Sequence, residues 1–119
     1  MKRMPRSASC ATEFALELLG GKWATVILAR LKEGPLRYSD LRRLLPTLSE
    51  KVLTQRLEDL QERGLVAKRS VDAASTRYVL TADAQALRPA LQHLYEWGEA
   101  QAERFNVTIL DRVLEPVEE

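Results

Sequence analysis

Apolar residues recur at helical spacing through the first half of the chain, and glycine, proline and serine residues divide this pattern into short segments. A Gly-Gly pair separates the first two segments, a Gly-Pro pair ends the second, and Ser39 and Ser49 are favourable N-caps for the next two. The pattern therefore predicts helices over residues 12–19, 22–33, 40–45 and 50–63. Because only a few residues join the last two helices, they are typical of a helix-turn-helix.

Beyond residue 64 the pattern changes from helical to alternating. Residues 65–71 and 77–80 are rich in β-forming side chains and are separated by residues 72–76, so they predict a β-hairpin. Residues 36–38 alternate in the same way and are a candidate short strand. A hairpin that follows a helix-turn-helix is the order of elements in a winged helix-turn-helix domain.

The last predicted helix is long. Thr81 is a favourable N-cap, and apolar spacing continues over residues 82–105, where Pro89 is expected to kink the helix or restart it. The predicted fold class is mainly α with a small β-hairpin. The expected organisation is a flexible basic segment, one winged helix-turn-helix domain and a tail, over residues 1–9, 10–105 and 106–119.

The helix predicted over residues 50–63 separates its apolar and polar residues. Leu53, Leu57 and Leu60 form one stripe, which is expected to face the core. The opposite face starts polar or cationic and becomes acidic, in the order Lys51, Thr54, Gln55, Glu58 and Glu62. Phosphates would repel the acidic end, so only the first two turns suit a contact with DNA. Plain solvation of a polar face is the alternative.

Charge is distributed unevenly along the chain. The 119 residues carry a net charge of +1, but residues 1–56 hold 11 Lys/Arg against 5 Asp/Glu, whereas residues 57–119 hold 7 against 12. Such asymmetry is one mark of a nucleic-acid face, although an unevenly charged solvated surface has the same composition.

No apolar run approaches the roughly 20 residues that span a bilayer, and a cytoplasmic protein is expected.

Three stretches together resemble a known family. They are "LLGGKW", "RYSDLRRLLPTLSEKVLTQRLEDLQERGLV" and "YEWGE", and over residues 10–104 the chain is similar to HxlR-type winged helix-turn-helix transcription regulators, relatives of the MarR group. The resemblance implies a homodimer that binds double-stranded DNA at a pseudo-palindromic operator. It also implies that residues 50–63 form the recognition helix and residues 65–80 the wing, and that the first and last helices form the dimer interface.

Polar residues on these elements are the candidates for DNA contact. Glutamine pairs with adenine, lysine with guanine or a phosphate, and the threonine methyl with the thymine methyl. Family members commonly have a longer wing tip with a proline, whereas this chain has "DAAST", so the cations on the strands are expected to contact DNA and give the wing a positive side. The candidate residues are Ser39, Arg42, Arg43, Ser49, Lys51, Thr54, Gln55, Lys68, Arg69 and Arg77.

The last helix offers an apolar stripe with large aromatic residues, part of which must pack on its own domain. A glycine in this stripe would let a second helix approach closely. The residues expected at the dimer interface are Leu91, Leu94, Tyr95, Trp97 and Gly98.

Cys10, the single cysteine, is the residue with reactive promise. It precedes the first helix, whose dipole and the nearby Arg6 would favour the thiolate, so it is a candidate redox sensor. Several HxlR-type regulators carry a cysteine there, usually as Cys-Pro, which is Cys10-Ala11 here. A passive cysteine is the alternative, and His93 is interpreted as a packing or surface residue.

The sequence also separates the possible classes of function. A catalytic Ser/His/Asp set, a Gly-rich phosphate loop and a metal-ligand cluster are all missing from the sequence, so neither an enzyme nor a cofactor is expected. The leading hypothesis is a DNA-binding regulator that responds to a small molecule or a redox signal. The alternative is a winged helix that binds another protein and no DNA, which the acidic second half would suit.

Overall fold

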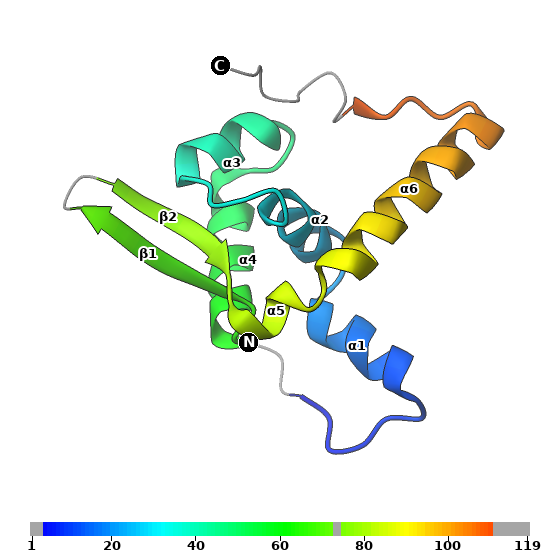
Figure 1. Cartoon of the computed structure of the whole chain (residues 1–119), viewed down its shortest axis with the longest axis horizontal. Coiled ribbons are helices and arrows are strands. Elements are labelled where there is room, and N and C mark those ends of the chain that lie inside the picture. The colour runs from blue at the N-terminus through cyan, green and yellow to red at the C-terminus, as the bar shows by residue number, and fades with distance from the viewer. Residues whose placement is uncertain (1–3, 73–74, 111–119) are drawn as a thin grey trace.

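The computed structural model describes residues 4–72 and 75–110 (Figure 1). The expectations for residues 1–3, for the wing tip at 73–74 and for the tail from 111 onward lie outside these ranges. The elements follow in the order α1 (Ala11–Leu19), α2 (Lys22–Leu31), α3 (Tyr38–Leu44), α4 (Glu50–Glu62), β1 (Val66–Asp72), β2 (Ser75–Leu80), α5 (Ala82–Gln85) and α6 (Arg88–Phe105). This is the predicted winged helix-turn-helix order, with a helix added at each end.

The core forms where α2, α3 and α4 meet the base of the hairpin. The predicted stripe on α4 is confirmed, because Leu53, Leu57 and Leu60 are 0%, 2% and 0% exposed. They share the core with Ile27 and Leu28 of α2 and with other aliphatic side chains. Burying a leucine side chain stabilises a fold by roughly 1.5–3 kcal/mol, so this stripe fixes which face of α4 points outward.

The wing is a two-stranded antiparallel hairpin. Its register pairs Val66 with Leu80 and Asp72 with Ser75, with an irregularity between Ser70 and Asp72. The second strand starts two residues before the predicted Arg77, because Ser75 and Thr76 also pair with β1. The predicted five-residue connection is therefore too long.

The candidate strand at residues 36–38 shrinks to a single bridge. Leu36 exchanges backbone hydrogen bonds with Tyr78, with N···O distances of 3.1 and 2.7 Å. The next residues cannot continue the strand because α3 already begins at Tyr38. The bridge still matters, since it ties the start of the helix-turn-helix to the wing.

Helix boundaries follow the local capping groups. Ser49 caps α4 as predicted, its Oγ accepting the Val52 N–H at 3.1 Å, and Thr81 accepts the Ala84 N–H at 3.3 Å. α2 ends at Leu31, earlier than predicted. Pro89 lies in the first turn of a new helix instead of kinking one long helix, so the region divides into a short α5 and a long α6.

Ser39 is not the cap of α3, which corrects the prediction. The helix begins one residue earlier, with Arg37 at the N-cap. The Asp40 carboxylate accepts the Arg37 backbone N–H at 2.9 Å and also contacts the guanidinium. Burial alone would raise the pKa of Asp40, but these hydrogen bonds and the charges of Arg37 and Arg43 outweigh it and lower that pKa.

The two terminal helices project from the side of the domain opposite the wing (Figure 1). None of the residues of α1 is buried, although Leu18 and Leu19 are partly buried against the core. α6 contributes Leu91 to the core and then extends away from the domain. Within residues 4–72 and 75–110, no helix combines the length and apolarity needed to cross a bilayer.

Replacing the capping carboxylate should reveal a pH-dependent contribution to stability. We expect Asp40→Ala to lower the free energy of unfolding by about 1 kcal/mol at neutral pH, because α3 loses its cap. The folded-state pKa lies below the ordinary value of 3.8, so this contribution is present above that pH and is lost as the pH falls through the folded-state pKa. Urea unfolding of both proteins at several pH values measures the difference.

Ser39→Ala is the matched control, because it would be the more destabilising of the two substitutions if Ser39 were the N-cap of α3. We expect a change within about 0.5 kcal/mol. A larger loss for Ser39→Ala than for Asp40→Ala would contradict the observed start of α3.

Candidate nucleic-acid interface

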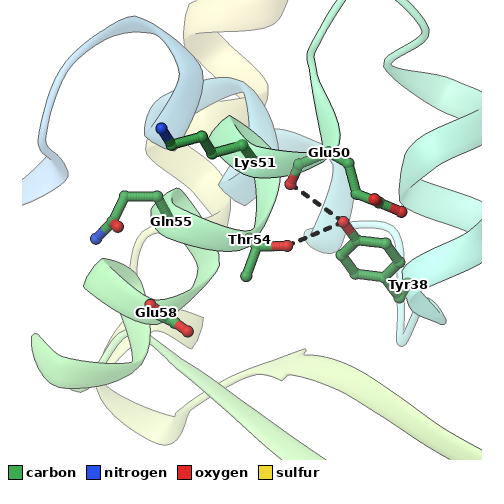
Figure 2. A pocket seen from close by; sticks show the side chains of 6 residues that line it. All are labelled: Tyr38, Glu50, Lys51, Thr54, Gln55 and Glu58. Carbon is green, nitrogen blue, oxygen red and sulfur yellow. Dashed lines mark hydrogen bonds between the residues drawn. The ribbon is translucent and has the colours of Figure 1, made fainter.

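The outer face of α4 borders an open hollow of about 520 Å³ (Figure 2). Lys51, Thr54 and Gln55 in the first two turns are all exposed, as the predicted separation of faces requires. Six residues line the hollow, one from α3 and five from α4: Tyr38, Glu50, Lys51, Thr54, Gln55 and Glu58.

Tyr38 fixes the side chain of Thr54. The Tyr38 hydroxyl lies 3.0 Å from Thr54 Oγ1 and donates to the backbone oxygen of Glu50 at 3.3 Å. Because the phenol has one proton, Thr54 donates to it when the phenol donates to Glu50. Figure 2 shows the Thr54 oxygen turned toward Tyr38 and its methyl group turned away. The group that Thr54 leaves outward is therefore apolar.

Gln55 and Lys51 differ in how they are held. The Gln55 side-chain amide donates to Asp59 Oδ1 at 3.1 Å, which leaves its carbonyl oxygen as an outward acceptor and one N–H unused. Lys51 has no hydrogen bond or ion pair to any other residue that the structure describes, and its ammonium group points away from the helix (Figure 2). The cation is thus available to an external anion or acceptor.

The arginines of α3 have separate tasks. Arg42 donates to the backbone oxygen of Leu48 at 3.2 Å, so it braces the turn between α3 and α4. Arg43 pairs with Asp40 at 3.6 Å, but its side chain is 63% exposed. Ser39 and Ser49 are exposed near the starts of α3 and α4. Of the two arginines, Arg43 has more of its charge available to DNA.

The predicted wing cations lie on two faces of the hairpin. Directly paired residues of an antiparallel ladder share a face, and Arg69 pairs with Arg77 whereas Lys68 pairs with the buried Tyr78. The Lys68 ammonium lies over the Tyr78 ring, 5.8 Å from its centre. The expected single positive side is therefore reduced to the two arginines. Like charges placed opposite one another repel, and an anion between them would relieve that repulsion.

The terminal helices expose large apolar side chains, but not all of those predicted. Leu91 is 4% exposed and packs in its own core, so its expected place at an interface is corrected. Leu94 and Trp97 are 53% and 64% exposed, whereas Tyr95 and Gly98 are half-buried. Other exposed apolar residues were not among those predicted: Phe14 and Leu16 of α1, Phe105 of α6, and Val107 and Leu110 just after α6.

Cys10 is the exposed N-cap of α1. Its sulfur accepts the Glu13 N–H at 3.4 Å. Ser9 donates to the Glu13 carboxylate from both its hydroxyl and its backbone N–H, each at 2.7 Å, and these hydrogen bonds lower the pKa of Glu13. A chemical change at the sulfur would therefore act directly on the first turn of α1.

Comparison with known proteins gives consistent matches. A family model described as HxlR-like helix-turn-helix matches residues 18–106. The HTH-type transcriptional regulator YkvN of Bacillus subtilis (strain 168) is 37% identical over 98 residues, which cover 81% of this chain and 83% of that protein. The matched region, residues 18–106, spans the helix-turn-helix, the wing and α6.

Solved structures share the fold. The redox regulator HypR in its oxidized form is 30% identical, with a TM-score of 0.69 over 76% of this chain and 96% of that chain. The quinone-bound YodB from B. subtilis is 30% identical, with a TM-score of 0.62 over 75% of this chain and 96% of that chain. These similarities confirm the predicted mainly α fold with a small hairpin.

Proposed function

Because the chain belongs to the HxlR-like helix-turn-helix family of transcription regulators, we propose that it is a dimeric, sequence-specific DNA-binding protein. In this proposal the first two turns of α4 lie in the major groove. The related proteins are regulators and not enzymes. A cytoplasmic location suits this role.

The observation that carries the proposal is the division of α4 into two faces. The leucines of α4 pack in the core, so the outward residues of its first two turns are not needed for core packing. One of these outward residues, Thr54, forms a hydrogen bond with Tyr38 of α3. Glu58 and Glu62 stand farther along the same outer face and would be repelled by phosphates. Helix-turn-helix proteins dock in this way, with the N-terminal residues of the second helix at the base edges.

Each outer side chain has a defined chemical preference. The Thr54 methyl suits a thymine methyl, and the outward oxygen of Gln55 suits the amino group of adenine or cytosine. Lys51 suits guanine or a phosphate. Asp59 holds one N–H of the Gln55 amide, so a two-bond pairing with adenine would use the outward oxygen and the remaining N–H.

Phosphate contacts would come from both sides of α4. Arg43 and the exposed serines lie on the helix-turn-helix side, and the Arg69 and Arg77 pair lies on the wing. Such contacts fix the position of a protein on DNA without reading sequence. Lys68 is not assigned this role because it shares a face with Tyr78.

A homodimer would place two copies of α4 on two half-sites. Half-sites of such proteins are spaced by about 34 Å, one turn of DNA, and are related by two-fold symmetry. α1 and α6 lie on the side of the domain opposite the wing, and their exposed apolar side chains support an interface there. A pseudo-palindromic operator follows from that symmetry.

An effector response is the second part of the proposal. HypR is described as a redox regulator and YodB was solved with a bound quinone. In this chain Cys10 is exposed and holds the first turn of α1 through its sulfur. Oxidation of the thiol, or its addition to a quinone, would remove that cap and alter a helix proposed to lie at the dimer interface.

Salt dependence separates the DNA-binding proposal from a winged helix that binds only proteins. We expect affinity for duplex DNA to fall steeply as salt rises, because each neutralised phosphate releases counterions. Arg43→Ala with Lys51→Ala should lower the slope of log K against log salt by about one for each phosphate that the protein no longer neutralises. Fluorescence anisotropy of labelled DNA measures both quantities.

Arg56→Ala is the control, because Arg56 pairs with Asp59 on the same helix and is only partly exposed. If the double variant kept the wild-type affinity and slope, the docking of α4 would be wrong. Failure of the wild type to bind selected or genomic DNA would favour the protein-interaction module.

Introducing charge at the exposed end of α6 should separate the protomers. Trp97→Glu is expected to convert the dimer into a monomer at micromolar concentration, because burying an unpaired carboxylate in an interface is strongly unfavourable. Gln92→Glu, five residues earlier and on another face of the helix, should remain dimeric. Analytical ultracentrifugation measures this, and a dimeric Trp97→Glu protein would remove α6 from the interface.

Cys10→Ser tests the effector response while preserving a good N-cap. We expect peroxide or a quinone to change the DNA affinity of the wild type by about tenfold, within the usual range of coupling between two sites. The serine variant should not respond. A response of equal size in Cys10→Ser would exclude Cys10 as the sensor.

A further inference from the structure

Arg63 joins the ends of two helices that are far apart in sequence. It is the C-cap residue of α4, and its Nη1 donates to the backbone oxygen of Leu18 in the last turn of α1 at 3.3 Å. The last carbonyls of a helix have no partner within the helix, and the negative end of the helix dipole favours a cation there. Arg63 therefore serves the C-terminal ends of both helices, α4 through its backbone N–H and α1 through its guanidinium.

Gly20 makes room for this contact. It ends α1 with a φ of 85°, and a Cβ placed on it would lie 2.1 Å from Arg63 Nη1. Any other residue would have to displace the guanidinium as well as adopt a left-handed backbone. The neighbouring Gly21 also has a positive φ, but its Cβ would meet nothing within 4 Å. The close approach is therefore specific to Gly20.

Forming this contact places part of the Arg63 side chain in an energetically unfavourable environment. The Nε of Arg63 is buried and has no hydrogen-bond partner among the residues that the structure describes. Leaving a buried donor unpaired is unfavourable. A side chain turned toward solvent would avoid that cost, but it would not reach the end of α1.

The surroundings of Arg63 connect three parts of the molecule. Gly64 follows in a left-handed turn, and its oxygen accepts the Thr81 hydroxyl at 2.6 Å, which fixes the exit from α4 into the wing. α1 itself has no buried residue, and its attachments to the domain include the partly buried Leu18 and Leu19 and the Arg63 bond. The Arg63 bond thus connects the last turn of α1 directly to the end of α4.

We propose that Arg63, seated against Gly20, is a positioning residue that holds α1 at a fixed angle to α4 and so sets the half-site spacing that the dimer accepts. This inference rests on the proposed DNA-binding dimer. It does not require Arg63 to touch DNA, because its guanidinium is turned toward α1. The DNA feature it controls is the distance between two half-sites, not the bases within one.

The contact itself can be tested without DNA. In Arg63→Met, amides in the last turn of α1 should exchange hydrogen about tenfold faster, because the variant cannot form the charge-assisted hydrogen bond to that turn. Amides of Leu57 and Leu60 in α4 should keep their protection. Gly20→Ala should have the same effect on α1, and Gly21→Ala, which meets no neighbour, should affect it less. Unchanged exchange in α1 of Arg63→Met would overturn the inference whatever Gly20→Ala does, because alanine at residue 20 also strains the left-handed backbone.

The consequence for DNA is tested with two kinds of duplex, one with a single half-site and one with two half-sites at varied spacing. Arg63→Met should bind the single half-site as the wild type does, with the same salt slope. It should bind the two-site duplex about tenfold more weakly and discriminate less between the selected spacing and spacings one or two base pairs longer. Arg56→Met, on the same helix, should match the wild type on both duplexes.

Each outcome decides the inference. Equal losses on both duplexes would contradict it, and a salt slope lowered by about one on the single half-site would make Arg63 a phosphate contact instead. Arg63→Gln removes the charge, and with it the charge-assisted hydrogen bond, and serves in all assays if Arg63→Met is unfolded at the assay temperature. A wild type that binds no DNA would refute the proposed function, while hydrogen exchange would still decide whether Arg63 positions α1.

Discussion

Burial of Leu53, Leu57 and Leu60 fixes the orientation of α4, and the proposed function depends on that orientation. The stripe packs against α2 and the base of the wing. Because the three leucines must face the core, Lys51, Thr54 and Gln55, which lie on the other side of the helix, face outward. The remaining contacts refine this arrangement. Ser49 starts the helix, Arg42 braces the preceding turn, and Arg63 connects the end of the helix to α1.

Features that repeat along the chain could be predicted from the sequence, and features that join distant residues could not. Helical spacing identified the faces of α4, and Ser49 and Thr81 were recognisable as caps because their oxygens act on residues only three positions away. The start of α3 was misplaced because Asp40 caps it from inside the helix. The pairing of Tyr38 with Thr54 and of Arg63 with Leu18 leaves no local pattern, so only the folded chain shows it.

The same distinction applies to the candidate surfaces. Counting cations on the wing suggested one positive side, but the strand register separates Lys68 from Arg69 and Arg77. Periodicity on α6 likewise grouped Leu91 with Leu94, although the first lies in the core and the second is exposed. A side chain's face is set by tertiary packing in both cases. The proposed DNA contacts can therefore use the two opposed arginines, and the proposed dimer contacts can use the exposed aromatic end of α6.

The claim that the first two turns of α4 read bases is tested most directly by selecting bound duplexes from random DNA. The wild type and Thr54→Ser are compared, because serine keeps the hydroxyl that pairs with Tyr38 and removes only the outward methyl. The variant is expected to lose the preference for thymine at one position in each half-site and to keep the preferences at all others. Identical selected sequences, or a loss of preference spread over the whole site, would contradict it.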